Sequence, residues 1–146
     1  MPSDRDIFFQ GFTDTQRQNF LTLGISEQYG PQEVILKESE LGSEMLLVEE
    51  GIISVWVKGA RVNEIGPECI LGVSSLLEPH PRTARLVSET KAHVLHFKRA
   101  RVLKHLETAS PKLFHTFFVN AFHIHMNLIR QCEERIVQLS LELNEL

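Results

Sequence analysis

The fold class is decided by the stretch MLLVEEGIISVWV at residues 45–57. It contains two short apolar runs, at residues 45–49 and 52–57, with Gly51 between them. Four further runs of this kind lie at residues 33–37, 61–65, 83–87 and 93–97, and glycine or proline stands between most of them. Many short strands broken by turn residues predict a sandwich, a jelly roll or a barrel.

Helices are predicted on both sides of this strand region, which spans residues 29–98. A helical lead-in is expected at residues 7–28, where Thr13 and Gln16 form a capping-box pair. Ser110 supplies an N-cap hydroxyl before Pro111, and neither glycine nor proline follows to the last residue. We therefore expect one domain over residues 1–146, with C-terminal helices from residue 99. The helix predicted at 111–146 is roughly 54 Å long if unbroken.

This long helix carries an apolar seam, whose members recur at alternating steps of four and three residues. They are Phe118, Phe122, His125, Ile129, Cys132, Ile136, Leu139, Leu143 and Leu146. The spacing is that of the a and d positions of a coiled coil. We expect the seam to form a homodimer through the C-terminal helix. A seam that covers a different protein, or one that packs only on its own domain, remains an alternative.

Composition and charge limit the function classes. The chain has 146 residues, of which 42% are hydrophobic and 23% charged, as is usual for a globular domain. A net charge of −4 argues against general binding to a nucleic acid backbone. Cys69 and Cys132 lie far apart, and the N-terminus lacks the apolar stretch of a signal peptide, so we expect a reducing, cytoplasmic location. No run reaches the roughly 18 apolar residues of a membrane span.

Known catalytic and metal-binding motifs are missing from the sequence. There is no nucleophile elbow, no P-loop glycine pattern and no metal-ligand spacing. We expect a protein that is not an enzyme, with no catalytic residues, no metal and no cofactor. The seven histidines are predicted to be ordinary helix and strand residues: His80, His93, His96, His105, His115, His123 and His125.

One loop between two predicted strands, ILGVSSLLEPHPRTA at residues 70–84, has the residues of a phosphate site. A short helical turn there presents free backbone amides beside the hydroxyls of Ser74 and Ser75. Arg82 adds a positive charge with a forked set of donors. These groups together can hold one phosphate.

At this point the sequence resembles the cyclic nucleotide-binding domain family over nearly the whole chain. The similar segments are residues 29–35, 42–55, 65–67, 71–72 and 81–84, followed by the long helix. The resemblance implies a mainly β fold, a double-stranded β-helix or jelly roll (the β-roll), with flanking helices. It implies a phosphate cassette that holds the cyclic phosphate of cAMP or cGMP. Arg82 matches the phosphate-binding arginine of the family, and Thr83 matches the hydroxyl position that follows it.

The departures from the family pattern bear on ligand binding. The family cassette usually reads Phe-Gly-Glu, and its glutamate accepts a hydrogen bond from the ribose 2′-hydroxyl, whereas this chain has Leu71-Gly72-Val73. Valine cannot accept that bond, which costs about 1.5–3 kcal/mol, or one to two decades of affinity. Glu68 replaces the glycine of the preceding Pro-Gly-Glu, and Glu78 is a candidate substitute for the missing carboxylate.

The resemblance also bears on the helical end of the chain. Asn127 and Arg130 lie where members of the family place side chains that contact the base. Related transcription factors continue into a helix-turn-helix, whereas this sequence ends at Leu146, so we expect no direct DNA binding.

Two functions follow from these features. The first is a dimeric sensor that binds cAMP, cGMP or a related nucleotide through Gly72, Val73, Ser74, Ser75, Arg82, Thr83, Asn127 and Arg130, and signals to a partner protein. The second is a dimerisation or protein-interaction domain that kept the fold and lost the nucleotide.

Overall fold

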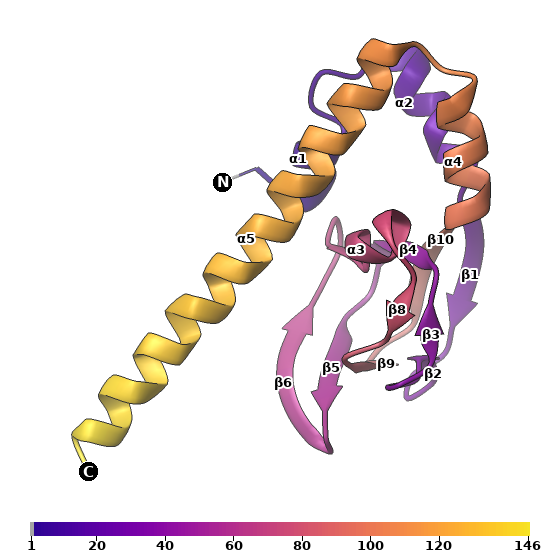
Figure 1. Cartoon of the computed structure of the whole chain (residues 1–146). Coiled ribbons are helices and arrows are strands. Elements are labelled where there is room, and N and C mark those ends of the chain that lie inside the picture. The colour runs from indigo at the N-terminus through magenta and orange to yellow at the C-terminus, as the bar shows by residue number, and fades with distance from the viewer. Residues whose placement is uncertain (1) are drawn as a thin grey trace.

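The computed structural model describes residues 2–146, and its strands form antiparallel sheets beside a long C-terminal helix (Figure 1). The helices are α1 (Asp4–Phe8), α2 (Asp14–Leu21), α3 (Val73–Leu77), α4 (Arg99–Glu107) and α5 (Pro111–Asn144). The strands are β1 (Ile25–Tyr29), β2 (Val34–Leu36), β3 (Leu41–Gly42), β4 (Glu44–Glu50), β5 (Ile53–Val57), β6 (Ala60–Ile65), β7 (Ile70–Leu71), β8 (His80–Pro81), β9 (Arg85–Ser88) and β10 (Ala92–Lys98). The mainly β fold with flanking helices and a long C-terminal helix is confirmed.

The strands pair in three sheets, all antiparallel. One sheet has the order β1-β10-β4-β7 and the second has the order β2-β9-β5-β6. β3 and β8 form a two-stranded sheet, in which Gly42 pairs with His80. This last pairing brings the chain before β4 alongside the loop that follows α3.

The predicted helical lead-in at residues 7–28 is wrong at both ends. Helix α1 already begins at Asp4, where the Ser3 hydroxyl accepts a hydrogen bond from the Asp6 amide. Residues 25–29 form strand β1, which pairs with β10 alone at the edge of its sheet. The capping box of Thr13 and Gln16 is present at the start of α2.

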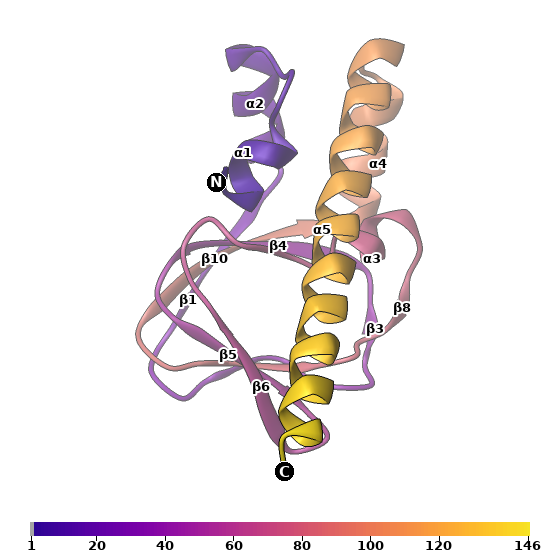
Figure 2. The same ribbon diagram turned by 90° about the vertical axis from the view of Figure 1, so that its left-hand side faces the viewer.

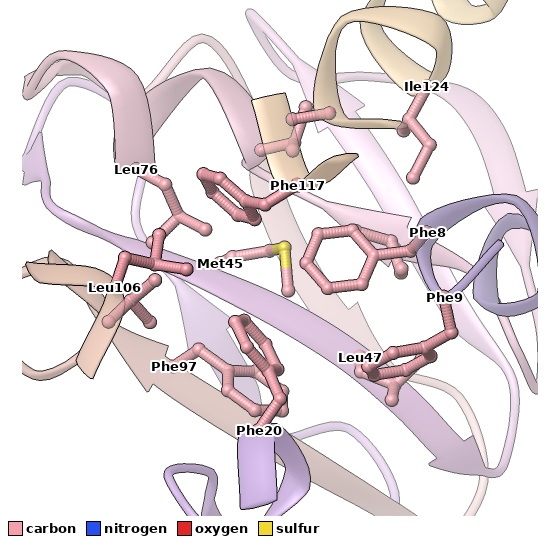
Figure 3. Close-up of a cluster of buried hydrophobic side chains, with 14 residues drawn as sticks. Phe8, Phe9, Phe20, Met45, Leu47, Leu76, Phe97, Leu106, Phe117 and Ile124 are labelled. Atoms are coloured by element: carbon pink, nitrogen blue, oxygen red, sulfur yellow. The ribbon is translucent and has the colours of Figure 1, made fainter. Parts of the chain in front are cut away.

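Strand β4 is buried on both faces, which explains its continuous apolar run. Because side chains alternate along a strand, Met45 and Leu47 face the helices while Leu46 and Val48 face the interior of the roll. The helix-side cluster packs Phe8, Phe20 and Phe117 on this strand (Figure 3). One strand thus belongs to two hydrophobic cores and joins the helices to the roll.

Helix α5 divides into a packed half and an exposed half. The Ser110 hydroxyl accepts from the Leu113 amide and begins the helix as expected. Buried side chains on α5 end at Ile124, and every residue from 128 to 146 is exposed. In both views this end of the helix extends well beyond the other helices (Figures 1 and 2).

Candidate ligand-binding site

The cassette loop leaves strand β7 through a left-handed glycine. Gly72 has φ 73° and stands at the N-cap of α3, a conformation that costs glycine little and other residues more. Helix α3 then runs to Leu77, and β8 returns the chain to Arg82. The sequence signals of this loop, a glycine followed by two serines and an arginine, therefore form one folded unit.

The Arg82 side chain links the cassette to strand β4. Its Nη1 donates to the Ser75 hydroxyl at 3.2 Å, and its Nη2 donates to the Glu44 carbonyl at 2.9 Å. The guanidinium lies against Gly42 and Gly72. A Cβ atom on Gly72 would stand 2.7 Å from Nη1, and one on Gly42 would overlap the guanidinium as well. The two glycines therefore make room for the arginine.

His80 joins this cluster, although its sequence position gave no sign of it. Its Nδ1 lies 3.0 Å from the Pro81 carbonyl oxygen, which only accepts, so Nδ1 carries the proton. In the neutral ring Nε2 then accepts from the Ser74 hydroxyl at 2.8 Å. Ser75, fully buried, lies between His80 and Arg82. Four polar side chains of the cassette thus satisfy one another.

A second polar chain, Tyr29–His96–Glu44, crosses strands β1, β10 and β4. His96 Nδ1 donates to Glu44 Oε1 at 2.9 Å, and the Tyr29 hydroxyl lies 2.9 Å from His96 Nε2. The hydrogen bond from His96 lowers the pKa of the Glu44 carboxyl and outweighs the burial that raises it. Burial, aided by nearby carboxylates, raises the pKa of Tyr29 to about 12, so its hydroxyl stays protonated. Glu44 is thereby held as a carboxylate beside Arg82.

A small polar cavity of about 220 Å³ opens beside Arg82. Its lining is Leu36, Glu40, Leu41, Ser43, Glu44 and Arg82. Burial lowers the pKa of Arg82, but a guanidinium keeps its charge throughout the range in which proteins fold. The cavity therefore presents one cation beside two carboxylates. Of its charged residues, sequence reasoning identified only Arg82.

Several predicted ligand residues lie away from this cavity. Val73 is 5% exposed and packs in the helix-side core with Leu76 and Phe117. Thr83 does not line the cavity, and Glu78, the candidate substitute carboxylate, is exposed and does not line it either. Arg82 is the one predicted ligand residue that lines the cavity, and ligand contact stays a prediction for all of them, namely Gly72, Val73, Ser74, Ser75, Arg82 and Thr83.

The two predicted base-contacting residues also lie apart from the cassette within one chain. Arg130 Nη1 donates to Asn127 Oδ1 at 3.1 Å on α5, and neither residue lines the cavity. The structure brings together Gly72, Ser74, Ser75 and Arg82, and leaves Asn127 and Arg130 on the helix. A role for this pair in ligand binding stays a prediction.

Glu68, which replaces a glycine of the family pattern, has a backbone conformation that favours glycine. Its backbone has φ 72°, in the left-handed region where glycine is favoured. The glycine of the family pattern is thus replaced by a glutamate that keeps a glycine-like conformation, at a cost in backbone strain.

Within the described residues, 2–146, the structure shows neither a cluster of metal ligands nor a membrane-spanning helix. No group of three or more His, Cys, Asp or Glu side chains in this range is arranged to hold a metal ion. None of its helices combines the length and the apolar character needed to cross a membrane.

Comparison with family models matches residues 26–109 to the cyclic nucleotide-binding domain. This range is more than half of the chain and includes β4, the cassette and Arg82. The chain belongs to the cyclic nucleotide-binding domain family. Curated proteins compared with the chain gave no match.

Solved structures show the same β-roll. A cyclic nucleotide-binding domain from Methylobacillus flagellatus has a TM-score of 0.81 at 20% identity, over 89% of this chain and 75% of that one. The catabolite activator protein of Thermus thermophilus has a TM-score of 0.77 at 19% identity, over 92% of this chain, which spans 63% of that protein. The N-terminal domain of a transcriptional regulator from Streptomyces coelicolor has a TM-score of 0.74 at 18% identity, over 90% and 94%. At these identities the likeness is one of fold.

The packing of Arg82 on Gly72 is tested by a pair of alanine substitutions. Gly59 has φ 80° and open space where a methyl group would stand, so Gly59→Ala should cost about 1–2 kcal/mol of unfolding free energy from backbone strain alone. Gly72→Ala should cost about 1–3 kcal/mol more, because its Cβ also meets Arg82 and the Glu44 carbonyl. Chemical denaturation measures both. Equal losses in the two variants would contradict the packing described here.

Proposed function

We propose that the chain is a ligand-sensing regulatory domain, rather than an enzyme, that binds cAMP, cGMP or a related nucleotide through Arg82. The observation that carries this proposal is the position of the Arg82 guanidinium. Its Nη2 lies 2.9 Å from the Glu44 carbonyl oxygen, and Gly42 and Gly72 leave the space that it occupies. The forked donors of this guanidinium suit phosphate oxygens, which would replace or share its present acceptors, the Ser75 hydroxyl and the Glu44 carbonyl. Membership of the family supports the same ligand class.

We propose further that the output of the domain is a homodimer formed through α5. The seam residues Phe118, Phe122 and Ile136 are between 46% and 62% exposed, although their chemistry favours burial. Residues on this seam recur with coiled-coil spacing, which supports pairing with a second copy. Cys69 and Cys132 are both free, which fits a reducing, cytoplasmic location. A signal would pass from the dimer to a partner protein.

A second function is favoured by two observations, the burial of Val73 and the small volume of the cavity. The position that supplies a ribose acceptor in the family faces the hydrophobic core here, at 5% exposure. The cavity of about 220 Å³ is also smaller than the roughly 300–1,000 Å³ of most ligand pockets. A domain that keeps the fold for dimerisation, without a nucleotide, fits both facts.

Nucleotide binding is tested by calorimetry with cAMP, cGMP and cyclic dinucleotides. We expect Arg82→Ala to weaken binding by about 100-fold, because it removes charge-assisted hydrogen bonds worth about 3 kcal/mol. Arg85→Ala is the matched control, since Arg85 lies only three residues away and stacks over Trp56 at 5.5 Å. That control should bind as the native chain does. Absence of heat with every nucleotide would favour the nucleotide-free function.

Dimerisation is tested by two neighbouring residues of α5. Ile136 and Val137 are 62% and 58% exposed, but only Ile136 lies on the seam, since adjacent helix residues point about 100° apart. Ile136→Glu should weaken the dimer about 100-fold, because each of two chains loses one buried apolar side chain and gains a charge. Val137→Glu should leave the dimer unchanged in analytical ultracentrifugation. A native chain that is monomeric at micromolar concentration would contradict the proposal.

A further inference from the structure

Helix α1 lies between the start of the cassette and helix α5, and it is hydrogen-bonded to both. It has only five residues, Asp4–Phe8, and it packs against α5, beside which it lies in Figure 1. The capping box at Ser3 fixes its first turn.

The cassette end of α1 is held by hydrogen bonds to the backbone. The amide of Ile70, the first residue of β7, donates to Asp4 Oδ2 at 2.9 Å. The amide of Arg5 donates to the Glu68 carbonyl at 3.1 Å, and its guanidinium pairs with Glu49 at 3.2 Å. Gly72 follows Ile70 by only two residues and begins α3. A shift of β7 that keeps these bonds must therefore move α1.

The other end of α1 is held by one buried side chain of α5. Asn120 is 5% exposed, and its Nδ2 donates to the carbonyls of Phe8 and Gln10, both at 2.8 Å. Phe8 is the last residue of α1 and is fully buried, so without Asn120 its carbonyl would lose a partner in the protein interior, whereas Gln10 is exposed. Phe8 also packs edge-on against Phe117 of α5, with 5.9 Å between ring centroids (Figure 3).

We propose that α1 is a rigid bridge that couples movement of the cassette to movement of α5. A single helical segment of this length does not bend easily, and both of its attachments would leave buried polar groups unpaired if they broke. Asn120 lies on the face of α5 opposite to the exposed seam residues Phe118 and Phe122. A displacement at Asn120 therefore changes the direction in which the seam points. The coupling is a property of the fold and holds whether or not a nucleotide binds.

The cassette also meets α5 directly, because Val73 and Leu76 share the helix-side core with Phe117 and Ile124. The test must therefore remove the bridge and leave this apolar contact in place. Asn120→Leu does so, since leucine has a similar volume and no donor.

Hydrogen–deuterium exchange of the full chain tests the bridge. In Asn120→Leu we expect the amides of residues 68–77 to exchange about tenfold faster, although the substitution lies on α5. The reverse effect is expected in Asp4→Ala, where residues 113–124 should exchange faster. Asp4→Asn keeps a side-chain oxygen for the Ile70 amide and should restore the native rates.

Gln16→Ala is the matched control, since it breaks the capping box of α2, which is local to that helix. Its effect should remain within residues 13–22. Faster exchange that is confined to residues 8–12 and 113–124 in Asn120→Leu would overturn the bridge, and so would an equal effect of Gln16→Ala on residues 68–77. If Asn120→Leu does not fold, the comparison of Asp4→Ala with Asp4→Asn decides the question by itself.

Discussion

The guanidinium of Arg82 is the interaction on which the cassette depends. It joins the Ser75 hydroxyl on α3 to the Glu44 carbonyl on β4, and it fits only because Gly42 and Gly72 carry no side chain. The same charge is the group that a phosphate would meet. A bound phosphate would compete with the protein for these donors, because it would have to replace the Ser75 hydroxyl or share the arginine with it. Under the proposed function, ligand binding would therefore depend on the conformation of the loop.

Strand β4 carries this local arrangement to the rest of the molecule. The backbone carbonyl of Glu44 accepts a hydrogen bond from Arg82, and the carboxylate of the same residue accepts one from His96. The apolar residues of the strand belong to both cores. The helix-side core in turn fixes the first half of α5 through Phe117 and Ile124. Because one strand belongs to both cores, the roll and the helices cannot shift independently without loss of packing.

The parts that can be predicted from sequence are those with local signals. The start of α5 follows from the Ser110-Pro111 pair, and the central strands follow from apolar runs between turn residues. Strands β3, β7 and β8 have two residues each and carry no periodic pattern, so no run marks them. Strand β1, ISEQY, is largely exposed at the edge of its sheet, and its polar residues do not distinguish it from the helical segment before it.

The candidate site divides in the same way. Resemblance locates Arg82 and Gly72, but the contact between Glu44 and His96 depends on the pairing of distant strands, which no local pattern reports. The contacts of His80 lie within the loop, to Ser74 and Pro81, and depend on how the loop folds back on itself. The burial of Val73 depends on the direction in which the loop turns, and neighbouring residues do not encode that direction.

The central claim is that Arg82 both links the cassette to strand β4 and binds the phosphate. NMR of the Arg82 side chain tests this claim most directly. The two Nη groups should show hindered rotation in the ligand-free protein, because each donates to a fixed acceptor. Their resonances, assigned by loss in Arg82→Lys, should move on titration with cAMP or cGMP. Freely rotating Nη groups, with resonances that saturating nucleotide leaves in place, would contradict the account.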